Sequence, residues 1–287
     1  MDTFKIGDTL LHWRSPYELA PGRFMELFRC QAPCGQDDIY ISARFEPLQP
    51  YTQYPCLGSR ELYDVYDVGG EKLLLYHWGY QRNAYGVWID RIRQGREDCC
   101  SFDPEIVNNR ILNADWFFGV CGLQRALLHR GWPVLHASYI DYNGKAILFT
   151  APSETGKSTQ AELWRLYAGA QVINGDRALL GKREGRWFAY GFPACGSSGV
   201  CIDRSLPIEA IVVLAQGKEN EITQLSAGEK LRALVTATVQ YRGDGEDFDM
   251  ALELAQQIAA QVPMVRLSCR PDRQAVEVLR QYLENSL

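Results

Sequence analysis

The segment Ala151-Pro-Ser-Glu-Thr-Gly-Lys-Ser158 constrains the fold of this chain more than any other stretch. It follows an apolar run, residues 146–150, and precedes a stretch compatible with a helix, residues 159–167. The pattern G-x-x-x-x-G-K-[S/T], known as Walker A, is matched at its last three positions, with alanine in place of the first glycine. Backbone N–H groups of such a loop and the N-terminus of the next helix converge on one anion. The order strand, loop, helix therefore predicts a phosphate-binding loop, with a nucleoside triphosphate as the leading ligand.

Each residue of this loop has a predicted task. We expect the Lys157 ammonium to reach the β- and γ-phosphates, the Ser158 hydroxyl to coordinate Mg²⁺, and Gly156 to let the backbone approach the phosphates. The predicted cofactors are thus ATP and Mg²⁺. The predicted nucleotide-binding residues are Pro152, Ser153, Glu154, Thr155, Gly156, Lys157, Ser158 and Thr159. The alternative is a helix N-terminus capped by Ser153 or Thr155, with Lys157 in solvent.

Composition narrows the class of protein. The chain has 287 residues, of which 46% are hydrophobic and 23% charged, which is ordinary for a globular protein. It has no apolar run near the roughly 20 residues of a membrane span, and its first residues do not resemble a signal peptide. The net charge of −5 comes with no basic block that would track nucleic acid. We therefore expect a cytoplasmic protein whose partners are neither nucleic acid nor a membrane, and a homo-oligomer stays open.

The nine cysteines favour reduced thiols over a metal site. Cys30 and Cys34 have the spacing C-x₃-C but no matching partner pair, and no C-x-x-C pair occurs.

The chain divides by pattern into two predicted domains, 1–105 and 106–287. The first is β-rich and predicted to be antiparallel, with strands near 38–45, 62–68, 72–78 and 84–89. Its dense Tyr and Trp residues either recognise an acceptor or simply pack a half-buried sheet face.

The second domain is predicted to be α/β, with a mixed sheet that carries the phosphate-binding loop. A helix over 108–129 leads into a hairpin, 134–142 and 145–150, whose turn is Asn143-Gly144. Further strands are expected at 171–176, on both sides of 184–185, at 210–214 and at 265–269, and helices near 228–240, 248–261 and 272–284. The hairpin gives the loop strand an antiparallel neighbour, which is unusual for a nucleotide-binding sheet.

Two more residues are candidates for chemistry. Asp176 follows the strand Val172-Ile-Asn-Gly, where a carboxylate is placed to hold the metal of a bound triphosphate; the alternative is an Asp that caps a turn. His136 lies on the first strand of the hairpin and is either catalytic or a core histidine. Arg177 either neutralises charge on a transferring phosphate or forms a salt bridge elsewhere.

The order His136, Asn143-Gly144, the loop 151–158 and Asn174-Gly-Asp176 resembles the catalytic domain of the HPr kinase/phosphorylase family, which shares its fold with phosphoenolpyruvate carboxykinase. The resemblance spans roughly 130–215 and is closest to HPr-kinase-like proteins, some of which phosphorylate a peptide serine. It implies that His136 lines a catalytic centre and that Lys157 and Ser158 hold phosphates and Mg²⁺. Asp176 would be the base toward an acceptor hydroxyl or a metal partner.

The predicted function is an ATP- and Mg²⁺-dependent kinase that phosphorylates a hydroxyl, in first place a Ser of a peptide or protein. One alternative is a kinase for a small metabolite. Another is a silent nucleotide-binding regulator, favoured by Gly175 where the family has a second Asp and by Glu154 where it has a loop glycine. The Gly191–Gly199 segment is expected either to hold the acceptor or to be a plain connection.

Overall fold

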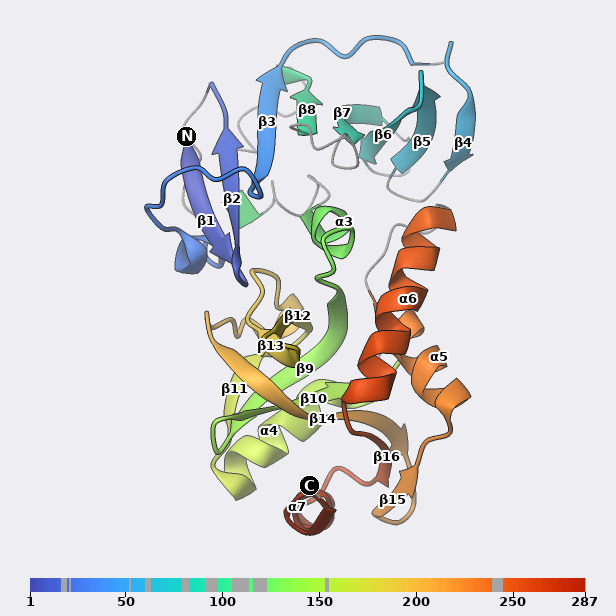
Figure 1. Ribbon diagram of the computed structural model, residues 1–287. Coiled ribbons are helices and arrows are strands. Elements are labelled where there is room, and N and C mark those ends of the chain that lie inside the picture. The colour runs from blue at the N-terminus through green and yellow to red at the C-terminus, as the bar shows by residue number, and fades with distance from the viewer. Residues whose placement is uncertain are drawn as a thin grey trace. The chain divides into compact units, whose positions relative to one another are not determined.

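The fold is described from a computed structural model of the chain (Figure 1). It describes residues 1–16, 20, 22–51, 53–59, 63–78, 83–90, 98–104, 114–115, 123–152, 155–238 and 245–286. The chain forms two compact units, Met1–His129 and Arg130–Leu287. The sequence predicts the boundary between residues 105 and 106, whereas the two units divide between residues 129 and 130.

The first unit is a single eight-stranded sheet in the order β1-β2-β3-β8-β7-β6-β5-β4. Its elements are β1 (Asp2–Ile6), β2 (Thr9–Arg14), the 3₁₀ helix η1 (Met25–Phe28), β3 (Ile39–Phe45), β4 (Cys56–Ser59), β5 (Tyr63–Val68), β6 (Glu71–Trp78), β7 (Asn83–Asp90), β8 (Asp98–Phe102) and α3 (Leu123–Leu128).

The prediction of a purely antiparallel first sheet is wrong. β3 runs parallel to both of its neighbours, β2 and β8. The cause is the connection between β2 and β3, which is long enough to cross over and return in the same direction, as a parallel pair requires. Only α3 and residues 114–115 of the predicted helix 108–129 are described as helical, and most of its remaining residues lie outside the described ranges.

The second unit is strand-rich α/β, as predicted, and contains a mixed sheet. Its elements are β9 (Val134–Tyr142), β10 (Lys145–Thr150), α4 (Lys157–Ala168), β11 (Gln171–Asn174), β12 (Arg177–Arg183), β13 (Arg186–Tyr190), η3 (Gly196–Ser198), β14 (Ser205–Gln216), β15 (Glu221–Gln224), α5 (Ala227–Ala237), α6 (Gly245–Gln261), β16 (Met264–Cys269) and α7 (Arg273–Ser286).

The loop strand β10 has an antiparallel neighbour on one side and a parallel neighbour on the other. β9 is the antiparallel neighbour and β14 the parallel one, and β14 in turn pairs parallel with β16. The path β10-β9-β12-β13-β14 returns to β10, so these five strands form a closed cycle of pairings. β10 is consequently hydrogen-bonded to a neighbouring strand on each side, which fixes the position of its end at Thr150.

Turn chemistry explains why the hairpin of β9 and β10 forms. Asn143 and Gly144 have φ values of 53° and 77°, and a two-residue turn with positive φ at both positions matches the twist of the flanking strands. The Asp141 carboxylate accepts a hydrogen bond of 2.9 Å from the N–H of Gly144. The prediction of this hairpin is confirmed.

Helix α4 is anchored by one aromatic side chain. Trp164 is fully buried in a core that also contains Phe149 of β10 and Val212 of β14, and α4 packs beside α7 (Figure 1). Burial of a Trp side chain contributes on the order of 5 kcal/mol by area. Gly169, in the left-handed region, ends the helix. Trp164 therefore holds the middle of α4 against the sheet.

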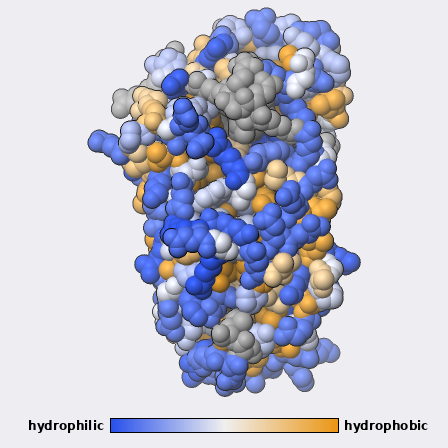
Figure 2. All heavy atoms as spheres, in the orientation of Figure 1, coloured by the Kyte–Doolittle hydropathy of each residue, from blue (hydrophilic) through white to orange (hydrophobic). Residues whose placement is uncertain are grey.

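The surface mixes residue kinds. On the face in Figure 2, hydrophobic residues are interspersed with hydrophilic ones. Within the described ranges, no helix is both long and apolar enough to cross a membrane.

Candidate functional site

The predicted phosphate-binding loop joins β10 to α4. Gly156 is the N-cap of α4, and its φ of 110° is a conformation that strains any residue with a side chain. The alternative in which Thr155 is the N-cap residue differs from this structure. The N-cap is the next residue, Gly156, which has no side chain. An anion is thus the complementary partner for the first-turn N–H groups. Ser153 and Glu154 lie outside the described residues.

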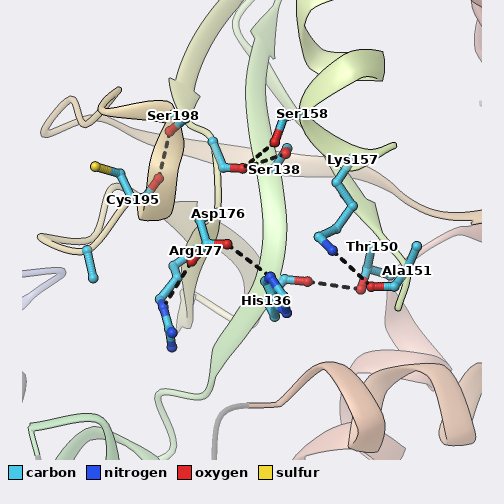
Figure 3. Close-up of polar contacts among 12 residues, drawn as sticks. His136, Ser138, Thr150, Ala151, Lys157, Ser158, Asp176, Arg177, Cys195 and Ser198 are labelled. Carbon is cyan, nitrogen blue, oxygen red and sulfur yellow. Dashed lines mark hydrogen bonds and ion pairs between the residues drawn. The ribbon is translucent and has the colours of Figure 1, made fainter. Parts of the chain in front are cut away.

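Lys157 points back into the loop instead of into solvent. Its side chain is 7% exposed, and Nζ donates hydrogen bonds to the carbonyl oxygens of Ala151 at 3.1 Å and Pro152 at 3.3 Å (Figure 3). Burial lowers the pKa of this ammonium, and the nearby Asp176 carboxylate opposes that shift. Among the described residues, the hydrogen bonds of this buried ammonium go to neutral carbonyl oxygens, so an anionic partner would stabilise it.

The elements of the site meet at one edge of the sheet. β11 and β10 are both antiparallel to β9, so β11 and β10 end at the edge where β9 begins. Asp176 follows β11, the loop follows β10, and His136 is near the start of β9. The strand that precedes Asp176 is not adjacent to the loop strand, because β9 lies between β10 and β11.

Two serine hydroxyls, one from α4 and one from β9, bond to the bend between β11 and β12. Ser158 Oγ donates to the carbonyl oxygen of Gly175 at 3.3 Å, and Ser138 Oγ donates to the same oxygen at 2.8 Å (Figure 3). Ser158 itself is exposed. Its hydroxyl therefore contacts the residue that precedes Asp176 and is still accessible to a ligand.

Asn174 builds the bend that carries Asp176. Its side-chain oxygen accepts hydrogen bonds from the backbone N–H groups of Asp176 at 3.0 Å and Arg177 at 2.8 Å. Its side-chain nitrogen donates to the carbonyl oxygens of Phe192 at 2.8 Å and Ala194 at 3.2 Å. Asn174 is fully buried. It thus ties the Asp176 bend to the 191–199 segment.

His136 and Asp176 form a hydrogen-bonded pair. His136 Nε2 lies 2.9 Å from Asp176 Oδ1, and Arg177 Nε lies 3.3 Å from Asp176 Oδ2 (Figure 3). His136 and Arg177 face each other in the register of β9 and β12. Because a carboxylate only accepts, Nε2 of His136 carries the proton and Nδ1 is left as an acceptor.

The electrostatic setting keeps His136 neutral. Burial lowers the pKa of its imidazole, and the charges of Lys157 and Arg177 lower it further, against the opposing effect of Asp176. At neutral pH the pair is a neutral imidazole donating to an ionised carboxylate, an arrangement that can orient the carboxylate and receive a proton at the site.

The 191–199 segment packs directly on Asp176. A Cβ on Gly196, whose φ is 56°, would lie 2.8 Å from Asp176 Cγ. A Cβ on Gly175 would lie 2.2 Å from Ser198 Oγ, which itself donates to the Cys195 carbonyl oxygen at 2.6 Å. The Ser198 side chain therefore fills the space in which a side chain at position 175 would begin.

The structure brings together four residues singled out from sequence, His136, Lys157, Ser158 and Asp176. Of the other predicted nucleotide-binding residues, Pro152 and Thr159 are exposed at the loop and first helical turn. Sequence reasoning missed the role of Asn174. The signal was the Asn-Gly-Asp run, since an Asn side chain commonly bonds the backbone two residues on. No cluster of three His, Cys, Asp or Glu side chains able to hold a metal occurs in the described part of the chain.

The fold and the site together define an α/β protein with a Gly-Lys-Ser loop at a helix N-terminus beside a His–Asp pair. The chain belongs to the family described as SynChlorMet cassette protein ScmC, whose family model matches residues 120–272. No curated protein matches the chain. Among solved structures, the HPr(Ser) kinase/phosphatase from Coxiella burnetii is similar at 12% identity, covering 53% of this chain and 92% of that one, with a TM-score of 0.30. That TM-score is too low to support an argument about this chain.

Proposed function

We propose that this protein is an ATP- and Mg²⁺-dependent kinase that transfers the γ-phosphoryl group to a hydroxyl, with Ser of a peptide or protein as the acceptor. The observation that carries the proposal is the convergence of the glycine-capped N-terminus of α4, the buried Lys157 and the His136–Asp176 pair at one sheet edge.

Each group has a role in the proposed transfer. The α4 N-terminus and Lys157 bind the phosphates, and Ser158 contributes a hydroxyl to Mg²⁺, which neutralises charge on the transferring group when bound. The acceptor oxygen attacks the γ-phosphorus, the bond to the β–γ bridging oxygen breaks, and Asp176 takes the hydroxyl proton. His136 holds the carboxylate in place through its Nε2–H, which lies 2.9 Å from Oδ1.

Connectivity supports the finer proposal of an HPr-kinase-like domain. His136 lies on the hairpin strand that precedes the loop strand, and Asp176 follows the next strand after α4. This is the arrangement that the resemblance implies. Within the proposal, the β-rich residues 1–105 recognise the acceptor, and the protein acts in the cytoplasm.

One observation favours a silent nucleotide-binding regulator as the second candidate. Ser198 fills the space beside Gly175, with its Oγ 2.2 Å from the position of a Cβ there. The bend between β11 and β12 therefore carries one carboxylate, that of Asp176. If phosphoryl transfer needs two carboxylates, this site would bind a nucleotide without transferring its phosphate.

The test uses ATP labelled at the γ-phosphate, Mg²⁺ and a cell extract. We expect label in a peptide or protein band with the wild-type chain and none with Lys157→Ala. Lys145→Ala is the matched control, because Lys145 lies at the other end of β10 and pairs with Glu209 at 2.7 Å. Label in a small molecule would show that the acceptor is a metabolite and not a peptide. Nucleotide binding without any transfer would show that the protein is a nucleotide-binding regulator and not a kinase.

A further inference from the structure

A second cluster of reactive side chains lies in the first unit, around β2 and the start of β3. His12 of β2 is fully buried, Cys34 is exposed in the connection before β3, and Asp38 immediately precedes β3. His12 Nε2 lies 2.6 Å from Asp38 Oδ2, and Cys34 Sγ lies 4.0 Å from His12 Nδ1. The carboxylate and the thiol thus contact different nitrogens of one imidazole, and Cys34 is the exposed member of the three.

The hydrogen bonds fix the tautomer of His12. Asp38 accepts from Nε2, so this nitrogen carries the proton and Nδ1 is the acceptor. Two donors face Nδ1, the Thr3 hydroxyl at 3.1 Å and the Cys34 thiol. Nδ1 therefore accepts from the Thr3 hydroxyl at the shorter distance and also lies within reach of the Cys34 thiol.

The surroundings hold the imidazole and the Cys34 backbone in position. The Tyr40 ring stacks on His12 at a centroid distance of 4.9 Å, and its hydroxyl donates to the carbonyl oxygen of Gly35 at 2.8 Å. The N–H of Gly35 donates to Asp38 Oδ2 at 2.6 Å. The Arg14 guanidinium lies 5.6 Å from the centre of the Tyr40 ring. Asp38 therefore fixes both the imidazole and the residue next to Cys34.

The Tyr40 phenol interacts electrostatically with the Cys34 thiol and the Asp38 carboxylate. Burial, the Cys34 thiol and the Asp38 carboxylate raise the pKa of the Tyr40 phenol, against the effect of Arg14. Once His12 has taken the thiol proton, the imidazolium can stabilise negative charge on sulfur.

We propose that Cys34 is a nucleophilic thiol, that His12 oriented by Asp38 takes its proton, and that the cluster accepts an acyl group from an activated ester. The sulfur–carbon bond forms as the bond from the carbonyl carbon to the leaving oxygen breaks. The thiol proton moves to His12 Nδ1 and then to the leaving oxygen, so the step needs no further reactant.

A metal site is the main alternative for such a cluster. Within the described residues, however, no three His, Cys, Asp or Glu side chains are arranged to hold a metal ion. The nucleophile interpretation uses instead the direction of Nδ1 and the exposure of the sulfur.

The experiment measures release of 4-nitrophenol from 4-nitrophenyl acetate at pH 6.5. Cys34→Ser is compared with Cys56→Ser, because Cys56 is also exposed but its thiol donates to the Gly58 carbonyl oxygen at 3.7 Å instead of facing an imidazole. An imidazole that takes the thiol proton makes the sulfur a better nucleophile toward an activated ester. We expect Cys34→Ser to slow release at least about tenfold and Cys56→Ser to leave it unchanged.

Two further variants test the partners of the thiol. His12→Gln and Asp38→Asn should each slow release several-fold, with melting followed by circular dichroism. Because His12 is buried, its variant can fail to fold, and then the partly exposed Asp38→Asn and Cys34→Ser decide the question. Equal effects of Cys34→Ser and Cys56→Ser would overturn the proposal, as would a folded Asp38→Asn protein with the wild-type rate.

Discussion

The His77–Asp64 pair of the first unit and the His136–Asp176 pair of the second show what separates a structural pair from a candidate catalytic one. His77 and Asp64 bridge β6 and β5 at 2.6 Å, and their side chains are 7% and 13% exposed. His136 and Asp176 are 2.9 Å apart, and their side chains are 36% and 24% exposed. The first pair lies inside one hairpin, whereas the second joins β9 to a bend that also holds the α4 N-terminus.

The difference teaches that pairing alone does not indicate function. Both histidines satisfy a carboxylate, but His136 also lies near the charges of Lys157 and Arg177 and keeps access to solvent. A substrate can reach the second pair and not the first. Four predictions sharpen this comparison.

The largest effect is expected at the carboxylates. Asp176→Asn keeps the shape and removes the charge, so phosphoryl transfer should fall about 10²–10⁴-fold while the protein stays folded. Asp64→Asn is the matched control and should leave transfer near the wild-type value. The measurement is single-turnover transfer from γ-labelled ATP together with thermal unfolding. Wild-type activity and melting temperature for Asp176→Asn would make Asp176 a turn residue.

The histidines should separate activity from stability. His136→Ala should retain Mg²⁺-ATP binding and lose at least about tenfold in transfer, roughly 1.4 kcal/mol of transition-state stabilisation. His77→Ala should instead destabilise the first unit by about 1–3 kcal/mol, since it removes a hydrogen-bond partner of buried Asp64. Denaturant unfolding and transfer assays on both variants check this. Normal transfer by folded His136→Ala protein would make His136 a packed strand residue.

Gly196 tests how closely the 191–199 segment must approach the second pair. Gly196→Ala adds a Cβ 2.8 Å from Asp176 Cγ at a φ of 56°, so we expect about 1–2 kcal/mol of destabilisation and a severalfold loss of transfer. Gly131→Ala, at a φ of 82° with nothing within 4 Å of the added Cβ, should show the backbone cost alone. Equal transfer by both variants would separate this segment from the site.

The smallest effect concerns protonation of His136. Its pKa is lowered below 6.5, so below pH 6.5 the unfolded chain binds more protons and folding stability decreases as the pH falls toward the folded-state pKa. Above pH 6.5 this group contributes no pH dependence. Lys157→Ala removes a positive charge and should raise the pKa of His136, as followed by its ring resonance in NMR. An unchanged or lower titration midpoint would contradict the electrostatic account.

Local sequence signals predicted much of the second unit. The hairpin turn Asn143-Gly144 and the turn at Glu184-Gly185 both have positive φ at both residues, a requirement that few residue types meet. β14 begins at Ser205, five residues earlier than predicted, because Leu206 and Ile208 continue the buried face in alternation. β15 was missed, since a four-residue edge strand with mostly exposed side chains has no apolar pattern.

Which strands pair with one another was harder to predict than which segments form strands or helices. The parallel pairs on both sides of β3 depend on how the long connections return, and composition does not encode this. At the site, the sequence indicated Lys157, Ser158 and Asp176 but gave no sign that Ser198 would lie against Gly175. That contact joins segments more than 20 residues apart and follows from packing of the 191–199 segment.

The central claim is that the loop before α4 binds a nucleoside triphosphate. Isothermal titration calorimetry with Mg²⁺-ATP tests it most directly, using wild-type, Lys157→Ala and Lys145→Ala proteins. Loss of the charge on the β- and γ-phosphates should weaken binding by Lys157→Ala at least about tenfold, while Lys145→Ala binds as the wild type does. Affinity of Lys157→Ala within about twofold of the wild type, or no binding by the wild-type chain, would contradict the assignment of the phosphate-binding loop.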